Sequence, residues 1–220
     1  VNTESKETLS GAYYRWSEKR FLTNQLSFAL EDAKKAYDIH ETEQNYQQYF
    51  MLAQKITEGM KPWDAAINHW ASFSKSERFA IERYSLSDDA ETFAGMLHLS
   101  YAKQLSSEQN PQAKSQFVMA EEHGIPVLDE LLSAASLLGE GVEKIALLNM
   151  AYQRSIDHEP EVSDTICKQI RSDLIASIAD WEKLGIPPQH VFALFDYAES
   201  YQLKHREIDY LNQYQKAALT

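Results

Sequence analysis

The feature that most constrains the fold of this chain is an aromatic residue that recurs at a nearly fixed interval. The intervals are 34, 33, 35, 29 and 33 residues, and the positions are Phe50, Tyr84, Phe117, Tyr152, Trp181 and Tyr214. In every case except Trp181, a small residue follows three positions later. Periods of this length are typical of stacked helix pairs, because one pair cannot bury its apolar face alone. We therefore expect a helical repeat protein that works by presenting a surface.

The composition favours helix almost throughout. The chain has 220 residues and 44% hydrophobic content, which is enough for one extended array or one to two globular domains. Only 7 Gly and 6 Pro occur, and no long β-branched run interrupts residues that favour helices. The expected fold class is all-α.

The charge and the cysteine count restrict the partners and the compartment. A formal net charge of −12 repels nucleic acid and anionic lipid, and no large Lys/Arg cluster reverses it locally. No stretch is apolar enough for a membrane helix, and the single Cys167 cannot form an internal disulfide. We expect no nucleic-acid binding, no membrane insertion and a cytoplasmic location. Because the chain begins at Val1, we also expect it to be part of a larger protein.

Apolar residues at three- and four-residue steps predict amphipathic helices that alternate with short polar breaks. The four clearest pairs are 22–39 with 46–53, 90–101 with 112–122, 126–138 with 142–156, and 188–203 with 207–219. Two less regular pairs are predicted at 63–73 with 76–84 and at 163–170 with 172–184.

The punctuation between these segments supports the same division. Proline disfavours helix in the residue before it, and Pro62, Pro126, Pro160 and Pro187 all fall where a helix is expected to end. No linker long or polar enough to separate two domains is visible. We therefore predict a single helical repeat domain over residues 1–220, with 1–21 as an N-terminal cap or extension and 22–219 as the repeats.

These spacings resemble the tetratricopeptide repeat, in which small residues let two helices approach closely and aromatic residues fill the gap to the next pair. The last unit carries most of the resemblance, through Leu194, Ala198, Tyr201, Tyr214 and Ala217. The first unit repeats it with Leu30, Tyr37, Phe50 and Ala53. The family is matched in degenerate form, since Lys34 replaces a small residue and Gly139 an aromatic one. The resemblance implies a right-handed superhelical array of about six antiparallel helix pairs.

In such arrays the first helix of each pair lines a concave groove that binds a peptide. Carried over to the two best-matched units, the groove positions are Phe28, Glu31, Lys35 and Asp38, followed by Phe192, Phe195, Glu199 and Gln202. Aromatic burial would give affinity and the charges would set register. An alternative is that the three phenylalanines simply pack between helices.

Sites for catalysis, metals and cofactors are not predicted. None of the seven histidines has the Glu spacing of a di-iron or His-Glu-x-x-His site, and no glycine-rich phosphate loop or nucleophile elbow occurs. Adjacent acids such as Glu121 and Glu122 point in different directions on a helix, which makes them poor acid/base pairs. We therefore expect no enzyme, no cofactor and no metal site.

The predicted function is that of a scaffold, adaptor or regulatory module for proteins or peptides. The acidic balance and the aromatic residues predict a partner segment that is basic and partly apolar. The alternative function is a ligand-responsive sensor domain of a larger signalling or transcription-regulating protein, which would require a buried polar cavity rather than an open groove. An enzyme would require clustered, strongly perturbed titratable groups.

Overall fold

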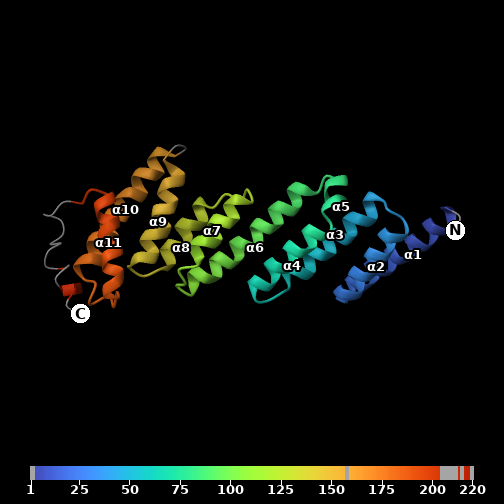
Figure 1. The fold of residues 1–220 in the computed structure, drawn as a ribbon, viewed down its shortest axis with the longest axis horizontal. Helices are drawn as coiled ribbons and strands as arrows, with labels where there is room; N and C mark the ends of the chain where they lie inside the picture. The colour runs from blue at the N-terminus through green and yellow to red at the C-terminus, as the bar shows by residue number, and fades with distance from the viewer. Residues whose placement is uncertain (1–2, 157–158, 204–212, 214–215, 219–220) are drawn as a thin grey trace. The chain divides into compact units, whose positions relative to one another are not determined.

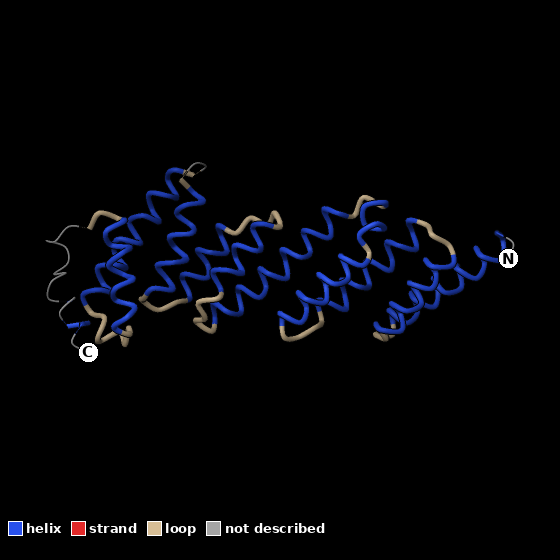
Figure 2. Tube along the Cα trace, viewed as in Figure 1, coloured by secondary structure: helices blue, strands red, loops and turns tan. Residues whose placement is uncertain are grey.

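The structure, a computed structural model, describes residues 3–156, 159–203, 213 and 216–218. Every regular element in these ranges is a helix, and the connections are short turns (Figure 2). This confirms the all-α prediction. Within the same ranges, no helix has both the length and the apolar character needed to cross a membrane.

The chain forms two compact units, residues 1–98 with 122–124 and residues 99–121 with 125–220. Unit 1 contains α1 (Thr3–Leu22), α2 (Leu26–Ile39), α3 (Glu43–Glu58), α4 (Trp63–Ser76), α5 (Arg78–Arg83) and the first part of α6 (Ser87–Ser107). Unit 2 contains the rest of α6 and then α7 (Ala113–Glu122), α8 (Leu128–Leu137), α9 (Val142–Ser155), α10 (Pro160–Ala179) and α11 (Pro188–Ser200), as labelled in Figure 1.

Neighbouring helices of unit 1 pack in antiparallel pairs around an aromatic core. The Tyr37 ring of α2 lies 5.0 Å from the Tyr46 ring of α3, and Phe50 lies 5.4 Å from Trp70 of α4. The predicted pair formed by α2 and α3 is confirmed. The next predicted pair is less regular, since only Glu77 separates α4 from the six-residue α5.

The predicted N-terminal extension is a 20-residue helix, α1, packed along α2. Small side chains make this close packing possible: Ala29, Ala33 and Ala36 of α2 are fully buried, as are Ser10 and Ser17 of α1. Helix α1 has almost no apolar stripe of its own. The interface with α2 therefore also contains polar side chains.

One buried amide joins three helices. Asn45 of α3 donates through Nδ2 to Ser10 Oγ of α1 at 2.9 Å, to the Ala36 carbonyl of α2 at 3.3 Å and to the His40 carbonyl at 2.8 Å. Ser10 Oγ in turn donates to the Ala36 carbonyl at 2.9 Å. Buried polar groups are stable only when they are paired, so this network specifies where α1 docks.

Unit 2 packs α8 on α9, α9 on α10, and α10 on α11. The predicted pair at 163–170 and 172–184 is wrong, because α10 is one continuous helix. Its apolar stripe, Ile166, Ile170, Leu174 and Ile178, repeats every four residues without a break and is buried along its whole length. Trp181 lies buried in the turn that follows, whereas Phe117 and Tyr152 lie on second helices of pairs as expected. Tyr214, and most of the predicted helix 207–219, lie outside the described residues.

Many helices end with the same backbone device, a left-handed residue followed by a hydrogen bond that spans six residues. Gly124 occupies this position after α7, and Gly185 occupies it at the end of the turn that follows α10. Asn24, Ser85, Gln109 and Gln202 also adopt it, with φ between 54° and 58°. Residue type marks the glycine positions as ends, whereas the predicted segment 76–84 stops at Ser85 without a glycine.

A buried ion pair stabilises unit 2. Lys144 Nζ of α9 lies 3.0 Å from Asp173 Oδ2 of α10 and 3.0 Å from Glu140 Oε1. Burial alone lowers the pKa of Lys144, but its hydrogen bonds to the two carboxylates outweigh this effect and hold the pKa above its ordinary value. Because the folded-state pKa is raised, the stabilisation is complete at neutral pH and is lost as pH rises through that pKa.

We expect the substitution Asn45→Ala to release α1 from unit 1. It removes three hydrogen bonds and leaves the Ala36 and His40 carbonyls with fewer donors, which costs about 2 kcal/mol. Hydrogen exchange should show lost protection in α1, and the urea midpoint should fall. The neighbouring exposed residue provides the control, since Gln44→Ala should leave both unchanged. Full protection of α1 in the Asn45→Ala variant would contradict the docking described above.

We expect Lys144→Met to destabilise the protein by about 3 kcal/mol at pH 7, because it leaves the buried Asp173 carboxylate without its cation. Lys103→Met is the matched control: Lys103 binds Glu130 at 2.8 Å in the same unit, but 49% of its side chain is exposed. The control should shift the denaturation midpoint much less. Equal shifts of the midpoint for the two variants would show that burial does not increase the contribution of the Lys144–Asp173 pair to stability.

Candidate functional site

The first set of predicted groove residues lies on the exposed face of α2. Phe28, Glu31, Lys35 and Asp38 are all exposed, and 56% of the Phe28 surface is accessible. These four residues therefore share one helix face that faces solvent.

Helix α1 extends this surface with aromatic and basic side chains. The Arg20 guanidinium lies 5.3 Å from the centre of the Phe28 ring, and Lys35 Nζ lies 5.7 Å from that of Tyr13. Tyr13 packs edge-on against Trp16, which is 51% exposed. We call this region the α1–α2 surface. None of the predicted binding residues lies on α1, although Leu9, Tyr13, Trp16 and Arg20 have the spacing of one helix face.

The residues of the second predicted set lie in different environments. Phe192 and Phe195 of α11 are half-buried, contact each other at 6.3 Å between ring centres, and pack against the core of unit 2. Glu199 is exposed on the same helix. Gln202 lies beyond the end of α11 in the left-handed conformation, so it does not continue the helix face. The alternative that these phenylalanines pack between helices describes their surroundings better than an open groove.

A groove of about 690 Å3 lies between α1 and α3. One wall is formed by Tyr14, Glu18, Phe21 and Leu22 of α1, and the other by Gln44, Gln47, Gln48 and Met51 of α3. Each set has the i, i+3 or i+4, i+7 spacing of a single helix face. We call this the α1–α3 groove.

A second groove of about 540 Å3 lies on the other side of α3. Its walls are Gln47, Phe50, Gln54 and Glu58 of α3 and Leu86, Asp89, Thr92, Phe93 and Met96 at the start of α6. We call this the α3–α6 groove. Because Gln47 lines both grooves, they adjoin each other across α3 and make one face lined by α1, α3 and α6.

This face carries apolar contact surface and an unsatisfied polar group. Leu22 is 83% exposed, Met96 52% and Met51 39%. Gln48 is only 8% exposed, and its Oε1 atom is buried without a hydrogen-bond partner in the described structure. A buried acceptor without a donor is costly, so a bound group that offers an N–H would be favoured at this position.

None of the predicted groove residues lines either groove. The prediction took α2 as a first helix and α3 as its partner, whereas the grooves lie between α1, α3 and α6. If α1 had been taken as the first helix of the array, the groove would have been assigned to α1 and α3 instead of α2. The sequence did not indicate α1 as a first helix because its polar residues are spread over all of its faces.

Three tyrosines in the core of unit 1 are buried and remain protonated at neutral pH. Burial, with a smaller contribution from Tyr84, raises the pKa of Tyr37 to about 12. Burial also raises the pKa of Tyr46 and of Tyr49, and the charge of Glu77 adds to both shifts. These groups form a packed cluster in which Tyr46 stacks on Tyr84 at 5.2 Å.

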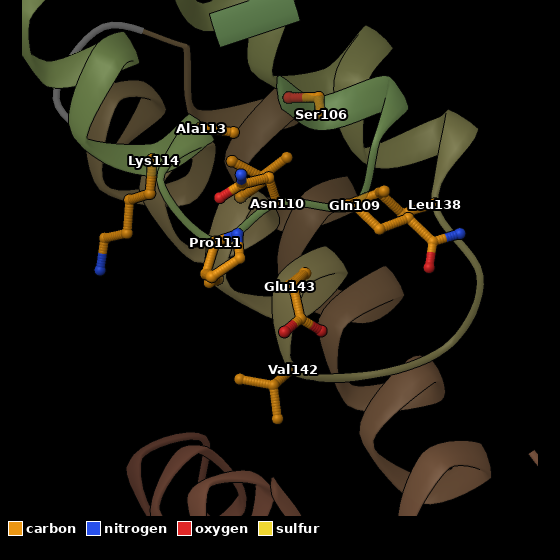
Figure 3. Close-up of a pocket in the computed structure, with 11 residues that line it drawn as sticks. Ser106, Gln109, Asn110, Pro111, Ala113, Lys114, Leu138, Val142 and Glu143 are labelled. Atoms are coloured by element: carbon orange, nitrogen blue, oxygen red, sulfur yellow. The ribbon is translucent and has the colours of Figure 1, made fainter. Parts of the chain in front are cut away.

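Two smaller cavities are present. In unit 1, a cavity of about 180 Å3 lies between α4 and α6, with His123 at its edge. In unit 2, a mostly apolar cavity of about 130 Å3 is lined by Gln109 to Pro111 from the α6–α7 connection, Leu138 from the end of α8, and Val142 and Glu143 from the start of α9 (Figure 3). No group of three or more metal-ligating side chains gathers anywhere in the described residues.

Comparison with known proteins adds no identity: no protein-family model, curated protein or solved structure matches this chain. The site must therefore be interpreted from its own chemistry.

The different surroundings of the predicted phenylalanines can be tested by stability. We expect Phe195→Ala to cost about 2 kcal/mol because it removes a ring that packs against the core of unit 2. Phe28→Ala should change the free energy of unfolding by less than about 0.5 kcal/mol, since most of that ring is exposed. Denaturant titration of the two variants measures both values. A larger loss for Phe28→Ala than for Phe195→Ala would reverse the assignment.

Proposed function

We propose that this chain is a module that binds a protein or peptide segment on the face of unit 1 lined by α1, α3 and α6. The observation that carries the proposal is the pair of adjoining grooves that share Gln47. Pockets between helices commonly receive a helix or an extended segment through spaced apolar anchors. The module acts as a scaffold, adaptor or regulatory domain rather than as an enzyme, and its setting is cytoplasmic.

The apolar residues on this face suit a partner that is held by side-chain burial. Met51 and Met96 have flexible, polarisable side chains, which adapt to partners of different shape. Phe50 and Phe93 provide a rigid floor, since both are mostly buried. The row of glutamines on α3 supplies amide donors and acceptors for a polar backbone.

The charge of the grooves favours a basic partner. Among the residues that line the two grooves, Glu18, Glu58 and Asp89 are acidic and none is Lys or Arg. Glu58 already binds Lys55 at 2.7 Å, while Glu18 and Asp89 have no ion pair within the described structure. The formal net charge of −12 acts in the same direction and disfavours nucleic acid as the partner. A segment that is basic and partly apolar fits this face best.

The proposal includes the finer architecture of a right-handed superhelical array of about six helix pairs, of the tetratricopeptide type. It is supported by the antiparallel packing of consecutive helices within each unit, and by α1 and α3, which line one face while the intervening α2 does not. In such arrays every second helix lines the same face.

The test is a selection from an unbiased displayed peptide library, followed by affinity measurements on the selected peptides. Met51→Glu places a carboxylate beside Gln47 and Gln48 and should weaken binding about 10-fold or more, because it adds a charge where an apolar anchor is buried.

Phe79→Glu is the control, since Phe79 is 84% exposed on α5 and lines neither groove. It should leave the affinity unchanged. Peptides that bind the Met51→Glu variant as tightly as the unchanged protein would overturn the proposed site. Selection of acidic peptides that still require Met51 would overturn only the charge preference.

The cavity between α4 and α6 favours a second candidate function, a ligand-responsive sensor domain. That function calls for a buried cavity with polar groups, and this cavity contains a buried hydroxyl and an imidazole. A sensor would change its exchange or proteolysis pattern when a small ligand is added, whereas a passive adaptor would not.

A further inference from the structure

The cavity between α4 and α6 is lined by one face of each helix. Ile67, Trp70 and Ser74 of α4 face Ala94 and Glu91 of α6, and His123 from the turn after α7 closes the edge. The volume is about 180 Å3. A protein cavity of about 150 Å3 is large enough to bind benzene. The space therefore suits a molecule with a single aromatic ring.

The walls are suited to an aromatic ring. Trp70 is 2% exposed and is held in place because its Nε1 donates to the Ala90 carbonyl at 3.1 Å and its ring contacts Phe93 at 4.6 Å. Opposite it, Ala94 leaves space that a larger side chain would fill. A rigid aromatic wall beside a small residue allows a ring to stack or to pack edge-on.

Two of the side chains that line this cavity carry polar groups. Ser74 Oγ is buried and has no hydrogen-bond partner among the described protein atoms. His123 Nδ1 lies 2.5 Å from Glu91 Oε2. A carboxylate can only accept, so neutral His123 carries its hydrogen on Nδ1, and Nε2 is left as an acceptor. His98 stacks on His123 at 5.5 Å with 12° between the ring planes, which fixes the plane of the imidazole.

We propose that this cavity binds a small neutral aromatic alcohol of the phenol class. The ligand must provide a donor for the imidazole nitrogen and an acceptor for the serine hydroxyl, and a phenolic hydroxyl is the smallest ring substituent that provides both. An aromatic carboxylate is disfavoured because its charge would lie near Glu91. The inference names the ligand class for the sensor alternative, but binding itself requires neither signalling nor the peptide grooves.

The experiment is ligand-observed NMR titration of the whole chain with phenol, toluene and benzoate as probes. We expect phenol to bind more tightly than toluene, and benzoate to bind least. Ser74→Ala should weaken phenol binding about 3- to 10-fold, as expected for the loss of one hydrogen bond, and leave toluene binding unchanged. The same substitution should not lower the melting temperature, because it removes an unsatisfied buried hydroxyl.

A second variant tests the location. Ala94→Leu fills the cavity and should abolish binding of both phenol and toluene, and a melting curve shows whether the variant is folded. Unchanged phenol affinity in folded Ala94→Leu would overturn the site. Toluene or benzoate binding as tightly as phenol, or the absence of an effect of Ser74→Ala on phenol, would overturn the ligand class. If Ala94→Leu does not fold, the Ser74→Ala comparison still decides the ligand class.

Discussion

The arrangement of unit 1 depends on the close approach of α1 and α3 to α2. That approach is possible because Ala29, Ala33 and Ala36 extend only one carbon from the α2 backbone, and all three are fully buried. The amide of Asn45 then connects the three helices through hydrogen bonds that have no solvent alternative. Small side chains set the distance and one polar side chain sets the register. The wall that α1 contributes to the α1–α3 groove follows from both.

The groove-bearing face and the ligand cavity are built on different faces of the same helix. In α6, Phe93 and Met96 line the α3–α6 groove, whereas Glu91 and Ala94 line the cavity. Trp70 forms a wall of the cavity and contacts Phe93 at 4.6 Å. The two proposed sites therefore share a layer of packed side chains.

Much of the fold could be predicted from the spacing of apolar residues, and the site could not. The pair formed by α2 and α3 followed from a stripe that recurs every three or four residues. Helix ends at Gln109 and Gln202 were missed because non-glycine residues adopt the left-handed conformation there. The prediction of two helices within residues 163–184 was wrong because the apolar stripe of α10 continues without a break. The groove was assigned to α2 because α1 buries serines rather than leucines, so its packing leaves no apolar pattern.

The central claim is that a bound segment lies on α1, α3 and α6 rather than on the α1–α2 surface. Oxidative footprinting by mass spectrometry tests this directly, because Met51 and Met96 on the groove-bearing face are exposed and react readily, as do Phe28 and Phe79 elsewhere in unit 1. With a saturating selected peptide, the account predicts that oxidation of Met51 and Met96 falls while that of Phe28 and Phe79 is unchanged. Protection of Phe28 with full oxidation of both methionines would contradict it.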